Sequence, residues 1–123
     1  MLLAGVAVAV AGALGAPLRY VLDGFVQDRT DSVFPRGTFV VNVTGSFILG
    51  LLTGLALYHA FPSDAKIVLG TGFCGAYTTF STFAYETVRL AEERAFGAAF
   101  QNTFSTMLVP ALAAAAGLAL AAI

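Results

Sequence analysis

The chain has 123 residues, of which 59% are hydrophobic and only 11% are charged. Soluble domains carry about 25% charged residues, so this composition excludes a soluble domain and is typical of an integral membrane protein. At about 20 apolar residues per crossing, the length allows four spans and leaves no room for a separate catalytic domain. The formal net charge of -1 is too small to indicate nucleic acid as a partner.

The first predicted span covers residues 2–27. Its apolar run is interrupted by Gly12, Gly15, Pro17 and Arg19. A cleaved signal peptide is the competing interpretation, but no Lys or Arg precedes the apolar stretch and Pro17 is badly placed for cleavage. Arg19 lies near the end of the span, where it either snorkels to the interface or serves as a buried structural or pore-mouth charge.

The second predicted span, residues 37–61, follows a polar loop and carries polar or small residues at every fourth position. These residues are Thr38, Asn42, Ser46, Gly50 and Gly54. Small residues let helix backbones approach closely, whereas an Asn in hydrocarbon needs a polar partner. The spacing therefore fits two interpretations, a helix-packing seam with Asn42 bonded across it or a polar lane with Asn42 at its centre.

The third predicted span, residues 67–90, contains the segment GTGFCGAYTTFSTFAYE, which is richer in glycine and hydroxyl groups than a lipid-facing helix. Glycines and β-branched threonines both lower helix propensity, so we expect a break near Tyr77 and Thr78. A break frees backbone carbonyls, which hydrocarbon tolerates only where they are buried in protein or line an aqueous path. Phe80 and Phe83 are three residues apart and share a face if the helix resumes there.

The last predicted span, residues 96–123, has Asn102, Thr106 and Pro110 at four-residue spacing. This spacing indicates a second polar lane, although Pro110 by itself predicts only a kink. No enzyme site is evident, because Glu86 lacks a paired carboxylate and no serine has a nearby histidine base. We therefore expect a permeation path or a packing network and no chemistry on a substrate.

Three segments resemble the signature segments of the Fluc family of fluoride channels, also called CrcB proteins. They are GALGAPLRY (12–20), PRGTFVVNVTGSFILG (35–50) and GFCGAYTTFSTFAYE (72–86). The resemblance covers essentially the whole chain, and TTFSTF is its most specific part. It implies an all-α protein of the cell membrane, with four-helix subunits that have a broken third helix and pair antiparallel. It also implies two narrow fluoride pores and a structural sodium ion at the dimer centre.

Carried over position by position, the resemblance implies that Asn42, Phe80 and Phe83 line the pore, with Thr38 on the same lane. The physical chemistry agrees, because fluoride holds its water tightly and a dry pore must replace that water with hydrogen-bond donors such as the Asn42 amide. A phenylalanine ring edge is the positive side of the ring quadrupole, so Phe80 and Phe83 can meet an anion edge-on. Without the resemblance, core packing is the simpler interpretation of two phenylalanines.

The resemblance also implies that the backbone carbonyls of Gly75 and Thr78 bind the sodium ion. Arg19 matches the arginine of the first motif, and Glu86 matches the acidic residue that closes the third. In the last span Thr106 keeps a hydroxyl on the pore track. Asn102 replaces a common tyrosine and Pro110 replaces a small or hydroxyl residue, so one polar track departs from the family pattern (aligned on Gly117).

The expected function is passive export of fluoride through a channel. Two alternatives stay open, a small four-helix multidrug exporter and a noncatalytic membrane assembly subunit. The exporter would need an acidic residue buried in the first span, where this chain has Arg19 and no acid before Asp23. The assembly subunit would use the polar lanes as packing seams.

Positive residues near the span ends predict the orientation. The loops that follow the first and third spans hold Arg29, Arg36, Arg89 and Arg94, while the opposite side has only Lys66. Positive charge favours the cytoplasm, so we expect both termini outside. A homodimer inserted in both orientations needs near balance. The bias therefore favours pairing with a paralogous subunit, with a homodimer as the second possibility.

Overall fold

The computed structural model describes residues 1–123 and consists of helices without strands, which confirms the expected all-α fold. The elements in chain order are α1 (Leu2–Asp28), α2 (Arg36–Tyr58), α3 (Ser63–Lys66), the π-helix η1 (Ile67–Cys74), α4 (Gly75–Tyr77), α5 (Ser81–Glu92) and α6 (Phe96–Ala121). Of these, α1, α2 and α6 are each long and apolar enough to cross a membrane.

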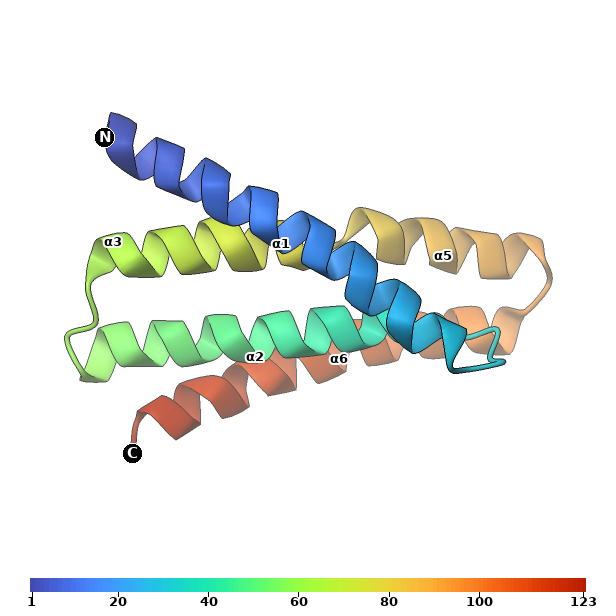
Figure 1. Ribbon diagram of the computed structural model, residues 1–123. Helices are drawn as coiled ribbons and strands as arrows, with labels where there is room; N and C mark the ends of the chain where they lie inside the picture. The colour runs from blue at the N-terminus through green and yellow to red at the C-terminus, as the bar shows by residue number, and fades with distance from the viewer.

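Figure 1 shows four long helical stretches, with the elements α3 to α5 forming one interrupted line. Helices α2 and α6 run side by side, and α1 crosses diagonally over α2 and over the line from α3 to α5. Both termini and the connection between α2 and α3 lie at one end of the molecule, and the other two connections lie at the opposite end.

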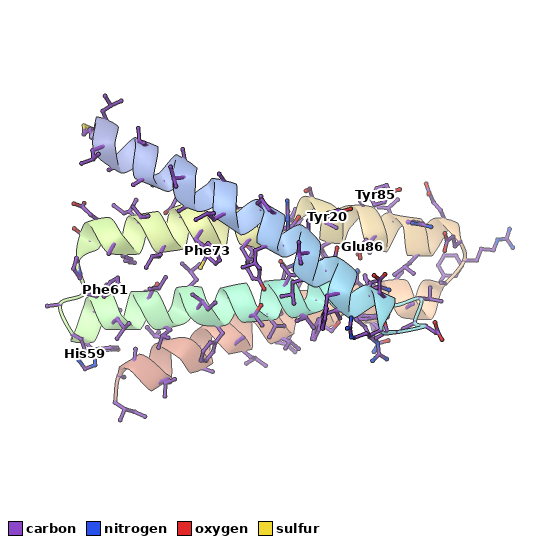
Figure 2. The ribbon with its side chains drawn as sticks, in the orientation of Figure 1. Tyr20, His59, Phe61, Phe73, Tyr85 and Glu86 are labelled. Atoms are coloured by element: carbon purple, nitrogen blue, oxygen red, sulfur yellow. The ribbon has the colours of Figure 1, made fainter.

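The second half of α2 packs directly against α6. A Cβ atom on Gly50 would collide with the backbone of Ala114, and one on Gly54 would collide with the side chain of Ala121. The two helix backbones therefore touch without intervening side chains, which is how small residues stabilise membrane helix pairs. At the end of this seam, the ring Nε2 of His59 lies 2.7 Å from the Ala121 carbonyl oxygen (Figure 2).

Helix α1 uses the same type of contact against η1. A Cβ on Gly72 would lie 2.8 Å from the Val8 carbonyl oxygen, and one on Gly15 would press on the carbonyl of Phe73. The wider turns of η1 cover 8 residues at this contact. Glycines on both helices thus bring α1 and the first half of the interrupted line together.

The helical backbone stops between α4 and α5. Thr78 is extended, with φ -78 and ψ 160, and its N–H and hydroxyl both donate to the Cys74 carbonyl, at 2.9 and 2.8 Å. Helix α5 then starts at Ser81, and its first turn is capped by Thr79, whose hydroxyl oxygen accepts the Thr82 N–H at 3.2 Å. Neither η1, with 8 residues, nor α5, with 12, is long enough to span a membrane by itself.

Candidate functional site

Asn42, on α2, binds the interruption, which is the non-helical segment of residues 78–80 between α4 and α5. Its Oδ1 accepts the Thr79 N–H at 2.8 Å, and its Nδ2 donates to the Thr79 carbonyl at 2.9 Å. These two bonds satisfy the backbone N–H and the backbone carbonyl of Thr79, which no helix pairs, and Asn42 is only 7% exposed. An amide nitrogen carries two hydrogens, so Asn42 keeps one N–H for another acceptor.

Tyr77 fixes the end of α4 on α2. Its hydroxyl lies 2.8 Å from the Thr44 hydroxyl. Thr44 donates its own hydrogen to the Val40 carbonyl at 2.8 Å, so Tyr77 is the donor in this pair. Because a Cβ at Gly45 would collide with Thr78, only glycine at that position lets the extended segment approach α2 this closely.

A cavity of about 350 Å³ opens beside the interruption. Its lining residues are Asn42, Ser46, Thr78, Thr79, Phe80, Phe83, Thr106, Met107 and Pro110. The structure thus brings together four of the residues assigned to the pore by resemblance, namely Asn42 on α2, Phe80 just before α5, Phe83 on α5 and Thr106 on α6. The rings of Phe80 and Phe83 are tilted by 58°, with centroids 5.7 Å apart. Phe83 is buried, whereas Phe80 is 76% exposed.

A buried chain of hydrogen bonds holds the α6 wall of this cavity. The Thr106 hydroxyl donates to Asn102 Oδ1 at 3.1 Å, and Asn102 Nδ2 donates to the Thr87 hydroxyl at 2.8 Å. Thr87 in turn donates to the Phe83 carbonyl at 2.8 Å. Asn102, 1% exposed, is therefore a bridge between α6 and the helix that carries Phe83. Sequence reasoning missed Thr87, whose one signal was its position four residues after Phe83.

Thr38 and Arg19 line a different cavity, of about 270 Å³. The Thr38 hydroxyl donates to Glu86 Oε1 at 2.6 Å, which ties α2 to α5 one turn before Asn42. Arg19 is half-buried in this cavity and forms no ion pair; the one ion pair in the chain joins Arg89 and Glu93. The structure therefore separates Thr38 and Arg19 from the cavity of Asn42.

The cavities follow one another along the interrupted line. Thr79 lines both the Asn42 cavity and the Arg19 cavity. Thr82 lines the Arg19 cavity and a third of about 470 Å³, which opens beside Glu86, Arg89 and Glu93. In Figure 2 Glu86 lies on α5 and Phe73 lies on the other side of the interruption. Polar groups thus extend from the charged end of the molecule to the phenylalanines.

No cluster of His, Cys, Asp or Glu side chains is placed to hold a metal ion. The carbonyls of Gly75 and Thr78 lack their helical partners, because the Thr79 N–H bonds Asn42 Oδ1 and the Thr82 N–H bonds the Thr79 hydroxyl. Gly75 is exposed on the surface of the subunit. Two hard oxygen atoms without protein partners are therefore available at the interruption.

The fold and the site define a small multi-pass membrane protein with a polar path beside an interrupted helix. A family profile described as "CrcB-like protein, Camphor Resistance (CrcB)" matches residues 6–118. The chain belongs to this family, as its sequence motifs predicted.

Curated relatives carry a functional name. The chain is 53% identical over 112 residues to "Fluoride-specific ion channel FluC 1" of Leifsonia xyli subsp. xyli, covering 91% of this chain and 82% of the relative. It is 52% identical over 109 residues to the protein of the same name in Streptomyces avermitilis, covering 88% of each. "Fluoride-specific ion channel FluC 2" of Mycolicibacterium paratuberculosis is 47% identical over 116 residues, covering 94% of this chain and 92% of the relative.

Proposed function

We propose that this chain is a subunit of a fluoride-selective channel that lets cytoplasmic fluoride leave the cell passively. The observation that carries the proposal is the cavity that Asn42, Phe80 and Phe83 line together, in a chain about half identical to proteins named fluoride-specific ion channels. The protein is a channel and not an enzyme.

The cavity suits a small anion that must lose its water. Asn42 keeps one N–H after it has bonded Thr79, and an amide hydrogen directed at an anion forms a charge-assisted bond. Phe80 and Phe83 both line the cavity, and an anion that meets a ring edge there meets the positive part of the ring quadrupole. Larger halides would lose their hydration on entering the space between Asn42, Phe80 and Phe83 without fitting it. This difference is the source of the selectivity for fluoride.

The elements from α3 to α5 act as one broken membrane span. Their exposed surface includes Thr71, Gly75 and Ser81, and the Gly75 and Thr78 carbonyls lack partners. Lipid cannot satisfy such groups, so another protein surface must cover them. An antiparallel second subunit meets this need and brings two copies of the interrupted helix together on the dimer axis.

A sodium ion at that axis would be held by the carbonyl oxygens of Gly75 and Thr78 from both subunits. Backbone carbonyl oxygens hold alkali cations in channels, and these two fit because the N–H groups that would bond them in a continuous helix bond Asn42 and Thr79 instead. The ion would attract the partial negative charges of the carbonyl oxygens where the subunits meet. A crystal structure of the dimer without cation density between these carbonyls would refute the site.

The subunit inserts with both termini outside. The α1–α2 and α5–α6 connections lie at the end of the molecule opposite the termini, whereas α3 lies near the termini (Figure 1). By sequence, the first two connections are flanked by or contain Arg29, Arg36, Arg89 and Arg94, and α3 ends at Lys66. This bias fixes one orientation, so the antiparallel partner is a paralogue of opposite bias, with a homodimer as the second possibility. Relatives that are numbered FluC 1 and FluC 2 fit such pairs.

Fluoride efflux from proteoliposomes tests the function. The chain is reconstituted alone and together with a coexpressed paralogue, and released fluoride is followed with an electrode, with chloride as the control anion. We expect fluoride release without chloride release, and slower release by Phe80→Ile and Phe83→Ile subunits that still assemble as dimers. A wild-type protein that releases no fluoride in either preparation would refute the proposal.

A further inference from the structure

Ser46 has a free hydroxyl in a setting where helix hydroxyls are normally bonded. It lies on α2 one turn after Asn42 and lines the same cavity, and its Oγ takes part in none of the hydrogen bonds of the structure. Other hydroxyls on α2 and α6 donate to the carbonyl four residues earlier, namely Thr44, Thr53, Thr103 and Ser105. Such bonds are the usual solution within a helix. Ser46 therefore keeps its hydrogen for an acceptor in the cavity.

The opposite wall of the cavity, on α6, has no donor to offer. The single hydroxyl hydrogen of Thr106 is directed at Asn102 Oδ1, so the oxygen of Thr106 presents only lone pairs elsewhere. Met107 has a thioether, and Pro110 has no N–H. The side chains of this wall therefore offer an anion in the cavity no hydrogen-bond donor.

The residues of the interruption have also used their hydroxyl hydrogens. Thr78 donates to the Cys74 carbonyl at 2.8 Å, and Thr79 donates to the Thr82 hydroxyl at 3.0 Å. The side-chain donors that remain on the cavity wall are the second N–H of Asn42 and the hydroxyl of Ser46. Both come from α2 and are four residues apart, about 6 Å along the axis.

We propose that Ser46 contacts the permeating anion and supplies, next to Asn42, the hydroxyl donor that the α6 wall lacks. This inference rests on the proposed function, because it assigns a residue to the same fluoride path. Fluoride passes from the Asn42 amide to the Ser46 hydroxyl as it moves along α2, with Phe83 on the other side. The Ser46 hydroxyl thereby compensates, within the same chain, for the polar groups of the family pattern that Asn102 and Pro110 replace on α6.

Single-channel conductance of the reconstituted protein tests the assignment, because the unit conductance does not depend on how many channels have assembled. The recordings use whichever preparation conducts fluoride, the single chain or the coexpressed pair. We expect Ser46→Ala to lower the unit fluoride conductance about tenfold, because a bond from a neutral donor to a charged acceptor is lost. Ser46→Cys keeps the volume and weakens the donor, and should give an intermediate conductance.

The matched control is Ser105→Ala. It makes the same chemical change on α6, at a hydroxyl that is bonded to Gln101 and does not line the cavity. Its conductance should equal that of the wild type. If Ser46→Ala, or Ser46→Cys where the alanine variant fails to insert, conducts like the control, the assignment of Ser46 is wrong while the channel function stands. A wild type that conducts no fluoride would overturn both.

Discussion

The two halves of α2 repeat a polar or small residue every fourth position, but they meet different neighbours. Thr38, Asn42 and Ser46 in the first half face α5, the interruption and the cavity. Gly50 and Gly54 in the second half press against the backbone and side chains of α6. The packing seam and the polar lane, which the spacing left as alternatives, are thus both present, on a stripe that winds around α2 by about 40° with each four-residue step.

This difference shows that a four-residue spacing does not by itself decide the use of a repeat in a membrane helix, because the residue type and the neighbouring element both change along it. Glycines at the repeat bring two backbones together and leave no space. Side chains with donors at the same repeat hold a neighbouring backbone at a distance and leave a cavity between the helices. Each of the following substitutions tests one half, with the fluoride efflux rate as the common measure.

The largest effect is expected from Gly50→Ala in the packing half. The added methyl meets the Ala114 backbone, which cannot move without shifting α6. Overpacking of this kind costs about 1–3 kcal/mol or more, so we expect little folded protein and almost no efflux. Size-exclusion chromatography in detergent and efflux from proteoliposomes measure both. Gly97→Ala is the control, because a Cβ there meets no atom within 4 Å; equal loss in both variants would contradict the seam.

Asn42→Asp in the polar half should abolish most transport while the fold persists. The carboxylate still accepts the Thr79 N–H, but it loses the donor to the Thr79 carbonyl and places a negative charge beside the anion path. We expect efflux to fall about a hundredfold from like-charge repulsion and the lost donor. Dimers that assemble normally and release fluoride at the wild-type rate would exclude Asn42 from the path.

Thr38→Val should have a smaller effect. The substitution keeps the shape and removes the donor at 2.6 Å from Glu86 Oε1, in a cavity that Asn42 does not line. Leaving a half-buried carboxylate without this partner costs about 1–3 kcal/mol, so we expect a lower melting temperature and efflux reduced about fivefold. Thermal unfolding in detergent gives the first quantity. An unchanged melting temperature would show that the bond contributes nothing to stability.

Thr53→Val makes the same change in the packing half and should have the least effect. The Thr53 hydroxyl donates to the Leu49 carbonyl of its own helix at 2.8 Å and contacts no group of the interruption. We expect efflux within about twofold of the wild type, because such back-bonding within a helix adds little stability. A loss as large as that of Thr38→Val would mean that the halves of α2 are not distinct.

Composition and periodicity were sufficient to predict the all-α membrane fold, because about 20 apolar residues per span is a direct requirement of the bilayer. The motif around Phe80 and Phe83 indicated the family and the residues beside the cavity. The reciprocal bonds between Asn42 and Thr79 could not be predicted, because they join residues 37 positions apart and depend on how closely α2 approaches the interruption. The separate cavity of Thr38 was hidden for the same reason, since spacing along one helix does not show which neighbour it meets.

The bonds between Asn42 and Thr79 also bear on biogenesis. A peptide unit that enters hydrocarbon unpaired costs several kcal/mol, and an interrupted helix exposes such units as it leaves the translocon. Asn42 precedes Thr79 in the chain, so the partner of the Thr79 N–H and carbonyl has left the ribosome before residue 79 does. The interruption can therefore close within a newly made single subunit. The surface that includes Thr71, Gly75 and Ser81 stays exposed on the subunit after these bonds have formed.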